Sequence, residues 1–178
     1  PVFLHPRTHE EYALARTERK SGHGYKGFTF HADPSVTLEE DLARRDFTVN
    51  AMAMNAKGDL IDPFQGFTDL QNKCMRHVSP AFSEDPLRVL RLARFLARFV
   101  DFSVAEETMA LCRELRESGE LKHLVAERIY AELNKGMGEV KPSRMIKLIS
   151  KLDAWGELAP SCSVPFSGFD KPEYDRLN

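Results

Sequence analysis

The sequence predicts an α+β fold, in which a β-rich first part is followed by an all-helical second part. In residues 1–80, short runs of strand character alternate with turns rich in Gly, Pro, Asn and Asp. From residue 84 onward, apolar residues recur at the three- and four-residue spacing of amphipathic helices. We therefore expect three units, namely residues 1–80, residues 81–160, and an irregular segment over residues 161–178.

The composition indicates a soluble globular protein. Hydrophobic residues make up 42% of the 178 residues and charged residues 29%, with a net charge of −2. Because the chain is not basic overall, nucleic-acid binding would have to come from a local basic patch. Cys74, Cys112 and Cys162 form no C-x-x-C pair, which favours a reducing, cytoplasmic location. No apolar run reaches the length of a membrane span, and the histidines show no metal-ligand pattern.

The first predicted elements are two short strands and a loop. Residues 2–5 and 11–17 have strand character on either side of a turn, so they are expected to pair as a hairpin. Residues 18–35 hold three glycines among basic and aromatic side chains. A loop of this length favours a functional role over a plain surface connector.

Short elements continue to residue 78. Thr37 and Glu40 form a capping box that opens a helix ending near Arg45. The end of the 44–55 segment and residues 60–62 have strand character on either side of a turn. Residues 62–70 predict a loop leading into a helical turn, and residues 74–78 a further strand.

A helix is predicted over residues 83–100, where Ser83 is the expected N-cap and Pro86 fits a first turn. Glu84 and Asp85 suit the positive end of the helix dipole. One face of this helix carries four arginines, namely Arg88, Arg91, Arg94 and Arg98. The opposite face is apolar and carries Val89, Ala93, Leu96 and Val100. The arginine face could present donors to an anionic ligand, or it could be the solvated face of a core helix.

Three more helices are predicted after residue 100. Ser103 and Glu106 form a second capping box, and the helix that they open is broken at Ser118-Gly119. Residues 126–137 keep helical spacing, and Pro142 marks the start of a helix that extends to about residue 152.

A dense polar cluster precedes the arginine helix. Its members are Arg44, Arg45, Asp46, Thr48 and Asn50. Two arginines can clamp a phosphate with forked donors, and Asp or Asn can hold a ribose hydroxyl. The alternative is a capped helix end joined to a strand, with the arginines in solvent. Further along, Asp62, Gly66 and Asp69 are on their own typical of turns.

Three segments, in this order and spacing, resemble the class II tRNA nucleotidyltransferases: R-R-D-F-T-V-N-A-M-A, D-P-F-Q-G-F-T-D-L and E-D-P-L-R-V-L-R-L-A-R-F. These are the CCA-adding enzymes, sisters of bacterial poly(A) polymerase. The segments V-F-L-H-P-R-T-H-E-E-Y-A-L-A-R-T-E-R-K-S-G and P-A-F-S-E-D-P-L-R-V-L-R are most similar to the gamma-proteobacterial type. The resemblance implies part of a nucleotidyltransferase head, with an incomplete antiparallel or mixed β-sheet, followed by an all-α neck.

The resemblance also implies roles for particular residues. The motif that holds the ribose and triphosphate of the incoming nucleotide is matched by Arg44, Arg45, Asp46, Thr48 and Asn50. The template that hydrogen-bonds the base of CTP or ATP is matched by Asp85 and Arg88, with Glu84 beside them and further nucleotide-binding positions at Arg91 and Arg94. The motif that joins the head to the neck is matched by Asp62, Gly66 and Asp69. The motif that braces the template helix is matched by Glu127-Arg128, and the family's flexible loop is matched by residues 21–30.

An Asp–Arg template has a simple physical basis. A carboxylate only accepts hydrogen bonds and a guanidinium only donates them, so together they complement the edge of cytosine and, after a small shift, that of adenine. Uracil or guanine would leave buried polar groups unpaired, which is a strong source of selectivity. The implied partners are CTP, ATP and the tRNA 3′ end, with no membrane.

The implied metal chemistry is only partly represented in the sequence. Phosphoryl transfer makes Mg²⁺ the expected cofactor. The family's glycine motif and D-x-D metal pair lie upstream of the match, and no D-x-D occurs in the chain. Glu11 matches a carboxylate that neighbours that pair and is the candidate catalytic residue. We therefore expect a fragment that is inactive alone, from a parent that adds CCA to tRNA.

Two alternatives stay open on these residues. A bacterial poly(A) polymerase shares all three segments, and a nucleotide- or RNA-binding module without catalysis would keep the same binding residues. An incomplete sheet would leave an open edge, so a domain-swapped or self-associated form is a further expectation.

Overall fold

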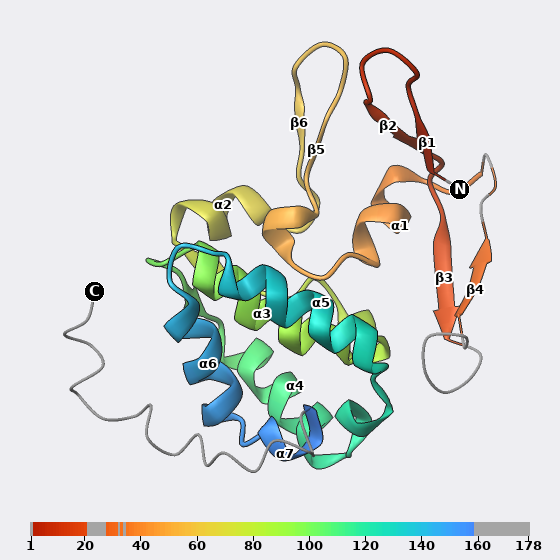
Figure 1. The fold of residues 1–178 in the computed structure, drawn as a ribbon. Helices are drawn as coiled ribbons and strands as arrows, with labels where there is room; N and C mark the ends of the chain where they lie inside the picture. The colour runs from red at the N-terminus through yellow and green to blue at the C-terminus, as the bar shows by residue number, and fades with distance from the viewer. Residues whose placement is uncertain (1, 21–27, 32, 34, 159–178) are drawn as a thin grey trace.

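The computed structural model describes residues 2–20, 28–31, 33 and 35–158. It has the predicted α+β fold, with short strand pairs dominating the first part and helices the second (Figure 1). The expected irregular segment 161–178 and most of the expected flexible loop 21–30 lie outside the described residues.

The strands form four two-stranded pairs among the described residues, instead of one incomplete sheet. The antiparallel pairs are β1 (Val2–Leu4) with β2 (Glu11–Ala13), β3 (Thr17–Lys20) with β4 (Phe28–His31), and β5 (Ala53–Met54) with β6 (Leu60–Ile61). A parallel pair joins β7 (Cys74–Met75) to β8 (Ser103–Val104). The content is therefore antiparallel and parallel together, as expected, but divided into separate ladders.

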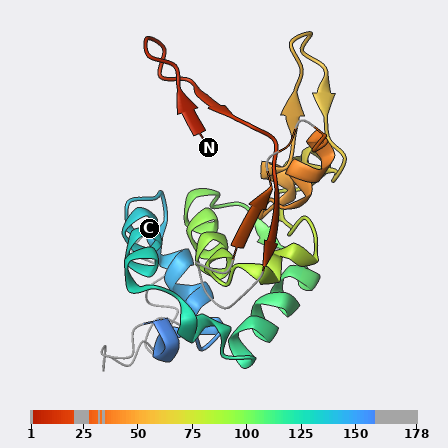
Figure 2. The same ribbon diagram turned by 90° about the vertical axis from the view of Figure 1, so that its right-hand side faces the viewer.

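Seven α-helices and three 3₁₀ turns occur in the described part of the chain. The α-helices are α1 (Leu38–Ala43), α2 (Gly66–Gln71), α3 (Leu87–Arg98), α4 (Glu106–Glu117), α5 (Ala126–Met137), α6 (Pro142–Lys151) and α7 (Trp155–Leu158). The 3₁₀ turns are η2 (Thr48–Asn50), η3 (Pro80–Glu84) and η4 (Glu120–His123). Helices α3 to α7 lie together, while the hairpins β1–β2 and β5–β6 project on the opposite side in both views (Figures 1 and 2).

A hairpin occupies part of the segment 18–35 that is predicted as a loop. Strands β3 and β4 pair from Thr17 opposite His31 to Lys20 opposite Phe28. The F-T-F sequence of β4 has the aromatic and β-branched residues that suit a pleated ladder, so strand pairing prevails there over the glycine-rich composition.

Helix α3 begins four residues later than predicted. Asp85 precedes Pro86, and the residue before a proline is disfavoured in helical conformation. Accordingly, Asp85 is extended, with φ −119° and ψ 99°, and α3 begins at Leu87. The predicted cap Ser83 lies inside η3, whose N-cap is Ser79, and the Asp85 side chain accepts from the Leu87 N–H at 3.2 Å.

The predicted capping box at Ser103 and Glu106 is also wrong. Ser103 pairs with Cys74 in the β7–β8 ladder, and α4 begins at Glu106 behind Ala105, which makes no side-chain cap. Ser103, whose hydroxyl is the predicted cap of the helix, is therefore part of a strand pair between distant segments. In contrast, the capping box of Thr37 and Glu40 is present and opens α1 as predicted.

One hydrophobic cluster joins the first part of the chain to the helices. Phe47, Met75 and Phe82 are fully buried in the same cluster as the inner faces of α3 to α7. Phe47 packs edge-on against Phe95 of α3, with ring centroids 5.5 Å apart. Because large aromatic side chains are shared, the polar segment 44–50 is held firmly against α3.

Helix α3 is the central helix of this cluster. Nine of its residues are buried, and α5 and α6 pack along it. Arg144 of α6 donates to the backbone carbonyls of Phe99 and Phe102 at 2.9 and 2.6 Å, just beyond the C-terminal end of α3. Both ends of α3 are therefore fixed, and the predicted apolar Val100 lies past the helix and is exposed.

The β1–β2 hairpin leaves large apolar side chains in solvent. Val2, Phe3, Leu4 and Tyr12 are each more than half exposed. Such a hairpin offers unpaired edges and two uncovered faces, so the expectation of self-association stays a prediction. Among the described residues, no helix is long and apolar enough to cross a membrane.

Candidate functional site

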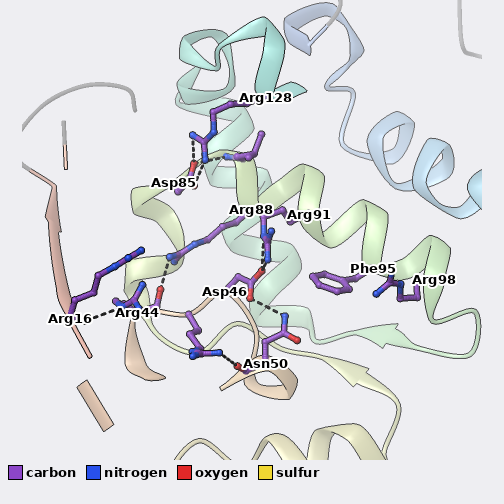
Figure 3. Close-up of a pocket in the computed structure, with 12 residues that line it drawn as sticks. Arg16, Arg44, Asp46, Asn50, Asp85, Arg88, Arg91, Phe95, Arg98 and Arg128 are labelled. Carbon is purple, nitrogen blue, oxygen red and sulfur yellow. Dashed lines mark hydrogen bonds and ion pairs between the residues drawn. The ribbon is translucent and has the colours of Figure 1, made fainter. Parts of the chain in front are cut away.

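An arginine-lined pocket of about 710 Å³ lies where segment 44–50 meets the first turns of α3 (Figure 3). Its walls are Arg16, Arg44, Arg45, Asp46, Asn50, Asp85, Leu87, Arg88, Arg91, Phe95, Arg98 and Arg128. Seven arginines against two aspartates give the pocket a strongly positive potential. The pocket is therefore suited to a polyanionic ligand of nucleotide size.

Asp46 ties the polar segment to α3. One carboxylate oxygen accepts from the Phe47 N–H at 2.9 Å and from the Asn50 amide at 3.0 Å. The other oxygen faces the Arg91 guanidinium, with Nε at 2.7 Å and the nearest terminal nitrogen at 2.6 Å. Asp46 is 6% exposed. With both oxygens engaged, it holds the site together and has little capacity left for a ribose hydroxyl.

Asp85 and Arg88 lie one turn apart at the start of α3, but they are held by different partners. Asp85 accepts two bonds from Arg128 of α5, at 2.9 and 3.3 Å. Arg88 donates to the Ala81 carbonyl and to the Arg44 carbonyl, both at 2.6 Å. Arg128 thus fixes the Asp85 carboxylate just before the start of α3 (Figure 3). The bracing role expected of Glu127-Arg128 stays a prediction.

Arg44 and Arg45 are held by the end of α1. Arg44 donates to Asp41 at 2.5 Å and to the Arg16 carbonyl at 2.9 Å. Arg45 donates to the Asn50 carbonyl at 3.1 Å, and its side chain is 44% exposed. Arg45 thus has the more open guanidinium of the two at the pocket rim.

Asp41 is the buried counter-charge of this arginine pair. Burial alone would raise the pKa of the Asp41 carboxyl. Hydrogen bonds from Arg44 and from the Arg16 N–H outweigh burial, so the pKa lies below its usual range. A depressed carboxyl pKa stabilises the fold above the unfolded-state pKa, and this contribution is lost as the pH falls through the folded-state pKa.

The Asp41→Asn variant should therefore differ from the unmodified chain in a pH-dependent way. We expect the variant's free energy of unfolding to be lower than that of the unmodified chain by a constant amount above about pH 5. This difference should shrink as the pH falls below about 4. Urea unfolding at a series of pH values measures this difference. A stability gap that stays constant down to pH 2 would contradict the assigned pKa direction.

The arginine face of α3 divides in the folded chain. Arg88, Arg91 and Arg98 line the pocket, but Arg94 does not. Arg94 is 8% exposed and pairs with Glu132 of α5, Nε to Oε2 at 2.7 Å. Arg94 therefore lies outside the pocket, because α5 supplies a buried carboxylate that pairs with it in the helical core. Its expected contact with a nucleotide stays a prediction.

Two other expected residues also lie away from the pocket. The Thr48 hydroxyl is buried and donates to Asp69 at 2.8 Å. Glu11 is exposed on β2, opposite Leu4, and is not among the lining residues. Within the described residues, no group of three or more His, Cys, Asp or Glu side chains could hold a metal ion. The described residues therefore do not by themselves form a Mg²⁺ site.

The expected head-to-neck motif forms a compact joint. Asp62 accepts the Gly66 and Phe67 N–H groups at 2.7 and 2.9 Å and so caps α2. Asp69 accepts from Thr48 and from Arg76, which in turn pairs with Glu107 of α4. The motif therefore links segment 44–50 to Arg76, which follows β7, and through Arg76 to α4. Its expected role in joining head and neck stays a prediction.

Two pocket residues carry no usable signal in the sequence. Arg16 follows a short strand, and its backbone N–H reaches Asp41, 25 residues away. Phe95 lies in the apolar repeat of α3, so its place in the pocket floor depends on how α3 is oriented. Only the tertiary arrangement brings these residues to the site.

Comparisons with known proteins agree with this architecture. The family model "Poly A polymerase head domain" matches residues 4–76, and "Probable RNA and SrmB- binding site of polymerase A" matches residues 101–163. The Multifunctional CCA protein of Dechloromonas aromatica is 60% identical over 98% of this chain and 42% of its own length. The chain thus spans less than half of that relative.

Two solved structures are also similar. The apo form II of a CCA-adding enzyme matches 98% of this chain and 42% of its own, with a TM-score of 0.76 and 30% identity. A CCA-adding enzyme in complex with CTP matches 69% of this chain and 30% of its own, with a TM-score of 0.65 and 39% identity.

The strand pairs, the helices behind them and the arginine-lined pocket define a nucleotidyltransferase fold. Within that class, this chain belongs to the family of the tRNA nucleotidyltransferases and poly(A) polymerases. The Dechloromonas aromatica relative matches this chain over almost its whole sequence.

Proposed function

We propose that this chain forms the nucleotide-selecting part of a tRNA nucleotidyltransferase that adds CCA to tRNA 3′ ends from CTP and ATP. The observation that carries the proposal is the juxtaposition of Asp85 and Arg88 in a pocket whose lining includes six further arginines. A relative solved with CTP supports a nucleoside triphosphate as the ligand. Residues 1–80 would act as head and residues 81–160 as neck.

The pocket separates the two tasks of nucleotide binding. Arg45 and Arg98 carry exposed guanidinium groups and suit the triphosphate, which any of the four nucleotides would present. Asp85 offers acceptors and Arg88 offers donors, which suits the edge of cytosine or adenine. Because Asp85 is bound to Arg128 in this structure, reading a base would require it to share or exchange that contact.

The proposed polymer partner is the tRNA 3′ end, and the proposed location is the cytoplasm. A family model described as an RNA-binding site matches residues 101–163, which supports an RNA partner. Mg²⁺ is the proposed cofactor of the complete enzyme, on chemical grounds, since phosphoryl transfer requires charge neutralisation at the triphosphate. No residue role in this chain depends on it.

The decisive assay uses the Dechloromonas aromatica relative as a host. This chain replaces the matching segment of that protein, and the chimera receives a tRNA transcript that lacks CCA. With CTP alone, we expect addition of cytidine. Robust incorporation of ATP without any cytidine would favour the poly(A) polymerase reading, and binding of both nucleotides by a chimera that incorporates neither would favour a module without catalysis.

Base selection should depend on Asp85 and Arg88 and not on Arg45. In the same chimera, Asp85→Asn or Arg88→Ala should lower the preference for CTP and ATP over UTP and GTP by about tenfold or more, since a good charge-assisted contact contributes about 1.5–3 kcal/mol. Arg45→Ala is the matched control, because it should weaken all four nucleotides alike. Unchanged selectivity in both template variants would overturn the assignment.

A further inference from the structure

A line of alternating charges runs from the pocket into the helical core. Asp46 contacts Arg91, Arg91 lies 3.9 Å from Glu132, and Glu132 accepts from Arg94 at 2.7 Å. Glu139 continues the line, 3.6 Å from Arg94. Glu132 is 5% exposed and lies on α5, outside every motif that carries the family resemblance. A buried carboxylate in this position requires a reason.

Phe95 shows what Glu132 balances. The Arg94 guanidinium lies 4.4 Å from the centre of the Phe95 ring, and that of Arg91 lies 5.7 Å from the same centre. Two like charges are therefore gathered around one buried ring in the pocket floor. Their mutual repulsion is strong in a medium of low dielectric unless an anion lies between them. Glu132 supplies that anion, with one oxygen toward each guanidinium.

Arg91 is the member of this line that faces the pocket. Its Nε and one terminal nitrogen are bound to Asp46, and its other terminal nitrogen is the one nearest Glu132. Two carboxylates, from segment 44–50 and from α5, thus hold one guanidinium from both sides. Together with the packing of Phe47 on Phe95, the contact between Asp46 and Arg91 holds segment 44–50 against α3.

We propose that Glu132 is a positioning residue for nucleotide binding, which fixes Arg91 against Asp46 through its buried charge. The proposal rests on the proposed function for its consequence in binding, but the coupling of Glu132 to Arg91 can be tested without a nucleotide. Glu132 is not among the residues that line the pocket, so its proposed effect on a bound nucleotide passes through Arg91.

The test compares two glutamine variants in this chain. Glu132→Gln keeps the size of the side chain and one acceptor oxygen but removes the charge. Glu139→Gln is the matched control, because Glu139 is also largely buried and also pairs with Arg94, yet makes no contact with Arg91. A double variant, Glu132→Gln with Arg94→Met, removes the buried cation as well and guards against loss of folding through an unpaired Arg94.

The first readout is hydrogen exchange of the Arg91 Nε–H group, followed by NMR on arginine-labelled protein. Loss of the second carboxylate should raise its exchange rate by about tenfold in Glu132→Gln and in the double variant, as expected when a charge-assisted contact is weakened. In Glu139→Gln the rate should change by less than about twofold. Equal rates in all variants, or full protection in the double variant, would overturn the proposal.

The second readout is the affinity for CTP and for ATP. Glu132→Gln should weaken both by the same factor, about fivefold to tenfold, because Arg91 is held by Asp46 and is not a member of the Asp85–Arg88 pair that is proposed to read the base. A change in the ratio of the two affinities would contradict a positioning role. The affinities are measured in the chimera with the Dechloromonas aromatica relative. If the unmodified chimera binds neither nucleotide, the proposed function fails, and the exchange rates in this chain still decide whether Glu132 positions Arg91.

Discussion

An Asp46→Ala variant is expected to lose about 3 kcal/mol of unfolding free energy, because removing one partner of a buried ion pair leaves the other without compensation. Asp46 is buried, and four donors converge on its two oxygens. The Arg91 side chain is 33% exposed and can partly return to water, so the cost falls at the low end of the range known for fully buried pairs. Urea unfolding monitored by circular dichroism measures the loss.

The matched control for Asp46 is Asp101→Ala. Asp101 also forms an ion pair, with Lys73 at 2.8 Å, but both side chains are more than half exposed. Water and salt screen such a pair, so its removal should leave the unfolding midpoint almost unchanged. Equal losses in the two variants would mean that the pocket pair has no special role in holding segment 44–50 against α3.

A Gly66→Ala variant is expected to be destabilised by about 3 kcal/mol or more, through a clash that no side-chain rotation can relieve. A Cβ at this position would lie 2.1 Å from the Thr48 carbonyl oxygen and 2.9 Å from the Met52 side chain. The greater helix propensity of alanine would return at most about 1 kcal/mol. The clash therefore outweighs the gain in helix propensity, so the change in stability is unfavourable. Relieving the clash requires α2 to move away from η2.

Gly156→Ala is the matched control for Gly66. Gly156 lies in α7, and no atom lies within 4 Å of the position that a Cβ would take. Alanine there should be neutral or stabilising by up to about 1 kcal/mol. Thermal unfolding of both variants provides the comparison. A Gly66→Ala variant as stable as Gly156→Ala would show that the joint between α2 and η2 can separate at little cost.

Local sequence patterns predicted the elements that are stabilised by local interactions. The hairpin at residues 2–13, the capping box at Thr37 and Glu40, and helix α5 lie where the sequence indicates them. The predictions that are wrong concern residues whose partners are distant in sequence. Ser103 could cap a helix, but it pairs with Cys74 in the β7–β8 ladder. Phe28–His31 forms a strand because it pairs with β3.

Asp85 and Pro86 show a different kind of error. The steric restriction that a proline places on the preceding residue is itself local and was available in the sequence. The acidic residues Glu84 and Asp85 favour an earlier helix start, but the restriction before Pro86 outweighs them. The correct start matters for the site, since the carboxylate of the extended Asp85 accepts both from the Leu87 N–H that opens α3 and from Arg128.

The sequence by itself determined the α+β class, the family, and the presence of arginines on one face of α3, because these depend on periodicity and on the order of motifs. Only the tertiary structure decided which arginines face the pocket. Arg91 and Arg94 are three residues apart on the same helix, and no property of α3 distinguishes them. Glu132 and Glu139, on and just beyond α5, draw Arg94 into the core, while Asp46 draws Arg91 to the pocket wall. A buried charge goes where its counter-charge lies, and that position is set by packing between distant segments.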